Sequence, residues 1–205
     1  MSETTHKKSK LLPIIVVIAI LGILVVWGVG TYNKLVSRQE TVESAVGNIQ
    51  TAYQKRADLI PNLVAAVKSY AEYESETLTA VIEARAKASS VNLNADNLNA
   101  ENLKAFQAAQ DELSGSLARL LATFERYPDL KANQNYLDLH NQLESCENLI
   151  ADARLKFNGT AQGYNIYLRR FPNNIIASLF NFDKMPYFEA QEGAETAPDV
   201  KALFE

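Results

Sequence analysis

Apolar residues recur at helical spacing along most of the chain. In the second half, eleven successive apolar positions between 136 and 171 lie three or four residues apart. Because an α-helix turns once about every 3.6 residues, positions at this spacing line one face of a helix. They are Tyr136, Leu139, Leu143, Cys146, Ile150, Ala153, Phe157, Ala161, Tyr164, Leu168 and Phe171. Similar series run through 35–53, 64–81 and, interrupted by Gln110, 103–124, and strand-like alternation is absent. The pattern predicts an all-α protein.

An apolar run near the start of the chain has a different character. Residues 11–29 contain no charged side chain. As a helix, these 19 residues span about 28 Å at ~1.5 Å per residue, close to the roughly 30 Å hydrocarbon core of a bilayer. Trp27 and Tyr32 lie at its C-terminal edge, where such rings favour the membrane interface. The run predicts a transmembrane helix over residues 11–30, with the lipid bilayer as its partner.

The charges that flank this run indicate its orientation. Three lysines precede it within residues 1–10, whereas Lys34 and Arg38 follow it, close to Glu40 and Glu43. Cytoplasmic flanks carry the excess of Lys and Arg. Residues 1–10 are therefore expected to form a basic cytoplasmic tail, and the body to lie on the periplasmic or extracellular side of the inner (cell) membrane. A cleaved signal peptide is the alternative, but its apolar core usually has about 7–15 residues, so the length favours a single-pass anchor.

Turn-forming residues divide the remaining chain into helices. The stretch 89–97 is rich in Asn and Ser, which favour turns and helix caps. Asn99 is a plausible N-cap for the helix that follows, and Pro128 is expected to end that helix. The last helix then carries the longest apolar series.

Pro61 leaves two arrangements open. If the chain turns there, helices cover about 33–60, 62–88, 101–126 and 133–171, and the similar lengths of the first three suit an up-and-down four-helix bundle. If the helix only kinks, a long kinked helical hairpin forms, and the apolar rhythm does continue across the proline. Because proline inside a helix destabilises it by ~3 kcal/mol or more, the preferred fold is the N-terminal transmembrane helix followed by the four-helix bundle.

Both arrangements return the end of the last helix toward the membrane. Residues 171–188 then hold five aromatic rings, a density that demands burial. They either fold back beneath the bundle or contact lipid headgroups or another subunit. The candidate membrane or partner contacts are Phe171, Ile175, Ile176, Leu179, Phe180, Phe182, Tyr187 and Phe188. Residues 189–205 are acidic, lack an apolar series and are expected to form a flexible tail.

Composition narrows the chemistry. The net charge of −4 over 205 residues argues against a nucleic-acid partner, because binding to phosphates needs an excess of clustered Lys and Arg. Cys146 lies within the apolar series and is interpreted as a small buried hydrophobe. Asn158-Gly159-Thr160 fits a glycosylation acceptor, but it falls inside a predicted helix and is discounted. No catalytic, cofactor or metal site is predicted, and so no enzyme.

Several strings resemble the LemA family. They are Tyr32-Asn33-Lys34-Leu35-Val36, Arg56-Ala57-Asp58-Leu59-Ile60-Pro61-Asn62-Leu63-Val64, Lys68-Ser69-Tyr70-Ala71, Asn133-Gln134-Asn135-Tyr136-Leu137, Ala153-Arg154, Tyr164-Asn165 and Phe171-Pro172. The resemblance implies a bacterial protein that is attached to the membrane at its N-terminus, with a LemA-like helical domain over residues 31–188. It implies no particular activity. Gly30-Thr31 stand where some members carry a lipid-bearing cysteine.

Taken together, these features predict a membrane-anchored, non-catalytic helical scaffold or adaptor of the bacterial envelope. It would act through protein–protein contacts and contacts with the membrane surface, as a homo-oligomer or with another membrane protein. The alternative is a regulatory or sensory module for a membrane enzyme such as a protease.

Overall fold

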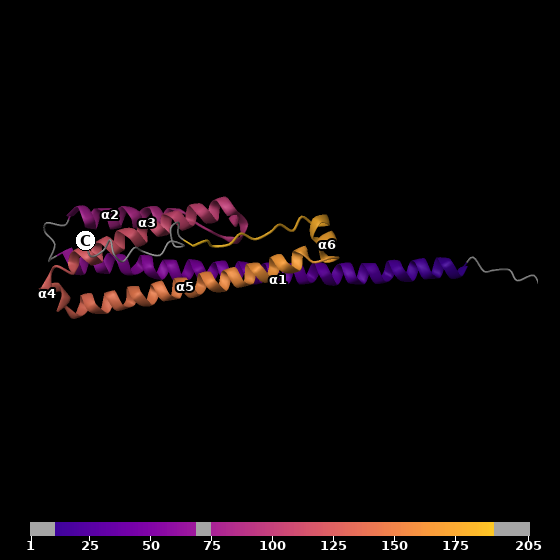
Figure 1. Cartoon of the computed structure of the whole chain (residues 1–205), viewed down its shortest axis with the longest axis horizontal. Helices are drawn as coiled ribbons and strands as arrows, with labels where there is room; N and C mark the ends of the chain where they lie inside the picture. Colours follow the sequence, from indigo (N-terminus) through magenta and orange to yellow (C-terminus); the bar gives the residue numbers. More distant parts are fainter. Residues whose placement is uncertain (1–10, 69–74, 191–205) are drawn as a thin grey trace, which may run out of the picture.

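The computed structural model describes residues 11–68 and 75–190, so the predicted tail 1–10 and most of the predicted tail 189–205 lie outside the described residues. Across the described ranges the chain forms helices and no strand, which confirms the all-α prediction. The helices are α1 (Leu11–Lys68), α2 (Ser75–Ser90), α3 (Ala100–Phe124), α4 (Pro128–Lys131), α5 (Gln134–Arg169) and α6 (Asn173–Leu179), with a 3-10 turn at Ala95–Asn97 (Figure 1).

α1 is a single helix of 58 residues, about 87 Å long at ~1.5 Å per residue. Its N-terminal part projects from the body, and its C-terminal part runs through the body (Figure 1). The projecting part is long and apolar enough to cross a membrane, and none of its most apolar window is buried by the rest of the chain. The apolar run and the core therefore belong to one continuous rod.

The body is built from four helices: the C-terminal part of α1, α2, α3 and α5. α1 lies along α5, and α2 lies along α3 (Figure 1). Tyr53 of α1 and Phe106 of α3 meet edge to face, with their ring centroids 5.1 Å apart. The predicted apolar series of α5 is buried or half-buried from Tyr136 to Leu168. The four-helix bundle with an N-terminal apolar helix is thus the observed fold.

The predicted turn at Pro61 is wrong, because α1 continues through this proline to Lys68. Proline lacks the N–H that would bond the carbonyl four residues earlier, here that of Ala57. Arg85 of α2 replaces that donor: its Nε lies 2.8 Å from the Ala57 carbonyl oxygen. A buried carbonyl is costly only when it is left unpaired. A side chain from the neighbouring helix thus compensates the backbone bond that Pro61 removes.

The other predicted boundaries hold in part. The side-chain oxygen of Asn99 accepts a hydrogen bond from the Asn102 N–H at 2.8 Å, so this residue is the N-cap of α3 as predicted. α3 ends at Phe124, before Pro128, which instead begins the short helix α4. Residues 62–68 belong to α1 and α2 has 16 residues, so the expected match in helix lengths is wrong.

Candidate functional site

The predicted contact residues surround α6, which lies beside α1 near the end of the apolar run. A Cβ at Gly28 would lie 3.5 Å from Ile176 Cδ1. The ring of Tyr32 packs against Phe180 and Phe182, with centroid separations of 4.9 and 5.6 Å. These contacts fix α6 at one level of α1, which is the level at which the projecting helix enters the body (Figure 1).

The structure divides the eight predicted contact residues into two sets. Phe171, Ile175, Leu179, Phe180 and Tyr187 are exposed, with Phe171 at 82% and Leu179 at 69%. Ile176 and Phe182 are half-buried against the core, and Phe188 is buried within it. The expected fold-back beneath the bundle therefore holds for Ile176, Phe182 and Phe188. Membrane or partner contact stays a prediction for the five exposed residues. Phe171 is exposed although it ends the apolar series, because α5 already ends at Arg169.

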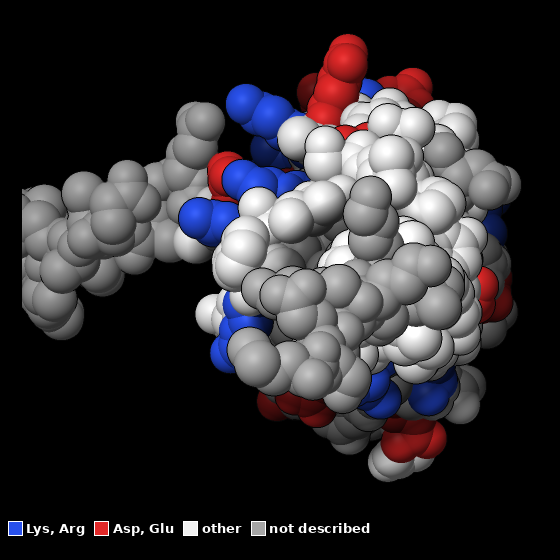
Figure 2. Space-filling model, turned by 90° about the vertical axis from the view of Figure 1, so that its right-hand side faces the viewer, with Lys and Arg blue, Asp and Glu red and all other residues white. Residues whose placement is uncertain are grey.

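An apolar groove of about 540 Å³ separates α6 from α1. Its α1 wall runs from Leu21 to Tyr32, and its α6 wall consists of Ile176, Leu179 and Phe180. Figure 2 views the molecule along its long axis, from the end at which α1 projects. Among the described residues in this view, uncharged ones face the viewer, and charged side chains lie toward the edge.

After a turn at Asn181 the chain returns along α5 as an irregular strap, residues 182–190, which two asparagines hold. The Asn165 amide donates to the Met185 carbonyl and accepts from the Met185 N–H, both at 2.9 Å. Asn158 makes the same pair of bonds with Phe188, again at 2.9 Å. Seven helical residues and three extended residues each cover about 10 Å, so the two spacings match. The strap thereby brings Phe188 to Phe157, with ring centroids 5.4 Å apart.

The apolar pattern of the sequence does not predict this strap. Asn158 fits a glycosylation acceptor in the sequence, but in the structure its side-chain amide bonds to the Phe188 backbone. The available signal was the spacing of two asparagines, seven residues apart, beside the apolar series of one helix.

A second feature is a polar layer in the core, centred on Arg56. This side chain of α1 is only 1% exposed. Its guanidinium donates to Ser114 Oγ at 2.7 Å, to Gln110 Oε1 at 2.7 Å and to Glu147 Oε1 at 2.8 Å. Gln110 Nε2 in turn donates to the Ala88 carbonyl of α2 at 3.4 Å. One buried cation therefore links α1, α3 and α5, and through Gln110 also α2.

The position of Arg56 in the sequence indicates that its side chain is buried. The residue lies three positions after Tyr53 and four before Ile60, both of which belong to the apolar face of the helix. A charged residue on such a face is buried only when it is paired. Gln110, which interrupts the apolar series of α3, is one of its partners.

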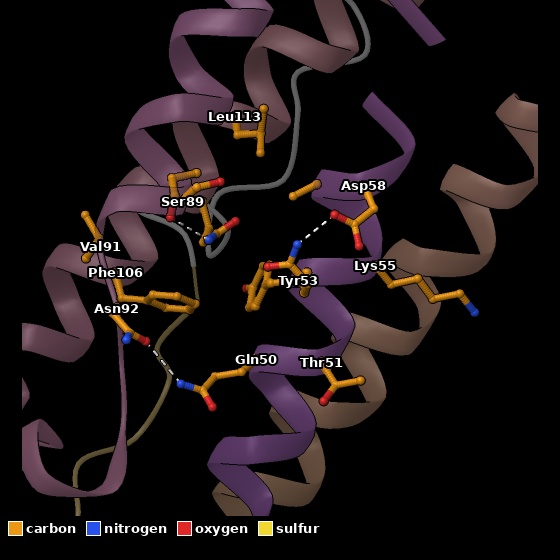
Figure 3. Close-up of a pocket in the computed structure, with 14 residues that line it drawn as sticks. Gln50, Thr51, Tyr53, Lys55, Asp58, Ser89, Val91, Asn92, Phe106 and Leu113 are labelled. Atoms are coloured by element: carbon orange, nitrogen blue, oxygen red, sulfur yellow. Dashed lines mark hydrogen bonds between the residues drawn. The ribbon is translucent and has the colours of Figure 1, made fainter. Parts of the chain in front are cut away.

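Beside this layer, a groove of about 610 Å³ opens between α1 and the α2–α3 hairpin (Figure 3). Its rim is polar: Gln50 Nε2 donates to Asn92 Oδ1 at 3.2 Å, and Gln54 Nε2 donates to Asp58 Oδ1 at 2.7 Å. Tyr53 and Phe106 form part of its lining. Burial raises the pKa of Tyr53, and the positive charge of nearby Arg154 lowers it by a smaller amount. This hydroxyl is therefore protonated at neutral pH.

The remaining candidate chemistry is limited to Cys146 and the acidic groups. Cys146 is buried, as predicted, and burial raises the pKa of its thiol. Within residues 11–68 and 75–190, no group of three or more His, Cys, Asp and Glu side chains is placed to hold a metal ion.

These features define a class: an all-α protein whose four-helix body continues directly into an N-terminal apolar helix of membrane-spanning length. The sequence model of the LemA family matches residues 45–202. The chain belongs to the LemA family.

Individual relatives cover most of the chain. Protein LemA of Metamycoplasma hominis is 28% identical over 183 residues, which is 89% of this chain and 80% of that protein. Magnetosome protein MamQ 2 of Paramagnetospirillum magneticum is 24% identical over 191 residues, 85% of this chain and 70% of that protein. Magnetosome protein MamQ of Magnetospirillum gryphiswaldense is 23% identical over 191 residues, which is again 85% of this chain and 70% of that protein.

Proposed function

We propose that this protein is a membrane-anchored, non-catalytic helical scaffold or adaptor of the bacterial envelope. One observation carries the proposal: the apolar run and the core of the body are parts of one uninterrupted helix. A flexible linker would let the body reorient freely, whereas a continuous helix transmits the position of the anchor to every helix packed on it. Such a rod presents helix surfaces at a fixed height and angle above the membrane.

The sequence flanks and the relatives support the placement. Three lysines before the run favour a cytoplasmic N-terminus and a body outside the inner membrane. The similarity to a Protein LemA and to magnetosome proteins supports a role in the bacterial envelope. The hydrogen bonds of Arg56 to Gln110, Ser114 and Glu147 support a structural role for the interior, because these groups are used to join helices.

Self-association is the part of this proposal that is tested most directly. α2 carries an outward-facing apolar residue, Ile82, which is 51% exposed and is available for a contact between chains. Detergent-extracted full-length protein should have a mass that is a multiple of the 22.7 kDa chain, or should co-purify with a defined membrane protein. Light scattering with refractive-index detection separates the detergent from the protein mass. A strictly monomeric species without a partner contradicts the scaffold proposal.

The groove between α1 and the α2–α3 hairpin favours a second candidate function. Its volume and its polar rim over aromatic residues are typical of small-molecule sites, which suits a sensory or regulatory module for a membrane enzyme such as a protease. A ligand that binds the folded chain and not the unfolded chain stabilises the fold by RT ln(1 + [L]/Kd), and so raises its melting temperature. A thermal-shift screen should then find compounds whose effect disappears in the Asn92→Ala variant but persists in the exposed control Ser37→Ala. Shifts that persist in both variants argue against this groove.

A further inference from the structure

We propose that α6 is a second membrane-contacting element, which lies in the interfacial region of the bilayer that α1 crosses, and that the groove between α6 and α1 holds a lipid acyl chain. This inference rests on the proposed membrane anchoring of α1. It adds a lipid site and a depth for the base of the body.

The depth of α6 follows from its contacts with α1. Ile176 lies against Gly28, and Phe180 lies against Tyr32. Gly28 belongs to the uncharged run, and Tyr32 follows that run by three residues. When residues 11–29 span the hydrocarbon core, these contacts place α6 at the boundary between acyl chains and headgroups. No flexible linker separates the two levels, because α1 is continuous.

The exposed surface of α6 suits that environment. α6 carries no charged residue, and its outer side chains Ile175 and Leu179 are exposed together with the flanking Phe171 and Phe180. Arg169 and Arg170 precede this apolar stretch in the sequence, and Asp183 and Lys184 follow it. An apolar face with polar flanks and aromatic rings is typical of elements that lie in the membrane interface.

The groove identifies lipid as the occupant. Its α1 wall begins at Leu21 and includes Leu24 and Val25, which lie up to about 12 Å inside the end of the apolar run at ~1.5 Å per residue. An occupant must therefore share the hydrocarbon core with α1. A water-soluble segment cannot reach this depth without losing its hydration, whereas the acyl chains of the surrounding lipids already fill that space.

Charge favours an apolar contact over an electrostatic one. Without the tail 1–10, the chain carries 17 Lys and Arg against 23 Asp and Glu, so the body is not attracted to anionic lipid. The contact should therefore form in vesicles of zwitterionic phosphatidylcholine alone.

Depth-dependent quenching of tryptophan tests the proposal in the full chain. Trp27, the only tryptophan of the sequence, reports on α1. Two variants move this reporter to the proposed element, Trp27→Phe with Leu179→Trp and Trp27→Phe with Phe171→Trp. A third, Trp27→Phe with Leu155→Trp, places it at a matched exposed apolar position on α5. Each protein is reconstituted into phosphatidylcholine vesicles with and without brominated acyl chains, after circular dichroism and thermal melting have verified its fold.

The expected result is a loss of emission from the Leu179→Trp and Phe171→Trp variants that is close to the loss from Trp27, with almost none from Leu155→Trp. Quenching of Trp27 without quenching of the two α6 variants overturns the inference and leaves the anchor intact; a blue-shifted but unquenched emission identifies a second chain on α6 and overturns it equally. Absence of quenching at Trp27 itself refutes the anchor and, with it, this inference. Phe171 is 82% exposed and does not line the groove, so its variant remains informative if Leu179→Trp disturbs the groove.

Discussion

At the scale of single residues, a side-chain hydrogen-bond donor replaces the backbone N–H that a proline lacks. Pro61 cannot bond the Ala57 carbonyl, and Arg85 Nε does so from α2 at 2.8 Å. This pairing explains how the apolar series of α1 continues through a proline without a turn. It also ties α2 to α1 at the point where the backbone ladder is weakest.

A double-mutant cycle tests this compensation. Arg85→Met leaves a buried carbonyl unpaired, so it should lower the free energy of unfolding by about 1–3 kcal/mol. In a Pro61→Ala background the residue 61 N–H restores the bond to the Ala57 carbonyl, and the same substitution should cost clearly less. The difference, on the order of 1 kcal/mol, is measured by urea unfolding of each of the four proteins. Equal costs in both backgrounds would show that Arg85 does not serve Pro61.

Tyr164 gives a pH-dependent prediction. Burial, with a smaller contribution from the charge of Asp183, raises the pKa of Tyr164 from 10.0 to about 12. Between these values the unfolded chain releases the phenolic proton while the folded chain keeps it. The stabilisation is therefore complete below about pH 10 and is lost as the pH rises to 12, by roughly 2–3 kcal/mol at ~1.36 kcal/mol per pKa unit.

The measurement compares the wild type with Tyr164→Phe at pH 8 and pH 11.5. The phenylalanine variant should lose less stability over this interval, because it has no proton to release. Some loss must remain, since burial also raises the pKa values of Tyr53 and Tyr136. Identical losses in both proteins would contradict the assignment to Tyr164.

At the scale of elements, the sequence predicted faces better than ends. Helix faces follow from many apolar positions that agree with one another, as in α5, where burial matches the series from Tyr136 to Leu168. The end of α1 depended on a single residue, Pro61, whose partner Arg85 is 24 positions away in the sequence. The strap was equally hidden, because Asn158 and Asn165 bond to backbone groups that no side-chain pattern reveals. Local rules therefore gave the fold class, while long-range hydrogen bonds set the boundaries and shaped the candidate site.

The strap provides the prediction at this scale. Asn165→Ala removes the donor to the Met185 carbonyl and the acceptor for the Met185 N–H, and should destabilise the fold by about 1–3 kcal/mol. Asn165→Asp keeps the acceptor for the Met185 N–H but loses the donor to the Met185 carbonyl. Its loss of unfolding free energy should therefore be smaller than that of Asn165→Ala. Hydrogen exchange of the Met185 amide, followed by mass spectrometry, reports on the strap itself. The exposed Gln162→Ala is the matched control.

If the asparagines hold the strap, exchange at Met185 becomes faster in Asn165→Ala and stays unchanged in Gln162→Ala. Faster exchange throughout α5 would instead indicate a general loss of helix stability. In that case the strap is a consequence of the packing of α5 and not of these side chains.

At the scale of the whole molecule, the continuity of α1 couples three features that could otherwise vary separately: the depth of the anchor, the height of α6 and the direction of the bundle. Gly28 and Tyr32 define the level of α6, and 36 residues further along the same helix its last residue, Lys68, marks the far end of the body. A change in how α1 sits in the membrane must therefore be followed by the body as a unit.

The orientation of the molecule should be controlled by the three lysines that precede the apolar run in the sequence. Replacing Lys7, Lys8 and Lys10 with Gln leaves Lys34 and Arg38 as the basic residues nearest the run, which by the positive-inside rule favours the opposite orientation.

An exposed cysteine on α5, introduced as Leu155→Cys, reports the orientation. The native Cys146 is buried and its thiol pKa is raised, so it should not be labelled. A membrane-impermeant maleimide added to intact spheroplasts should label the reporter in the parent protein and label it much less in the variant with the three Gln substitutions, with full labelling of both after lysis. Labelling of the parent only after lysis would place the body in the cytoplasm and reverse the proposed orientation, and labelling of the wild type at Cys146 would show that the core opens under these conditions.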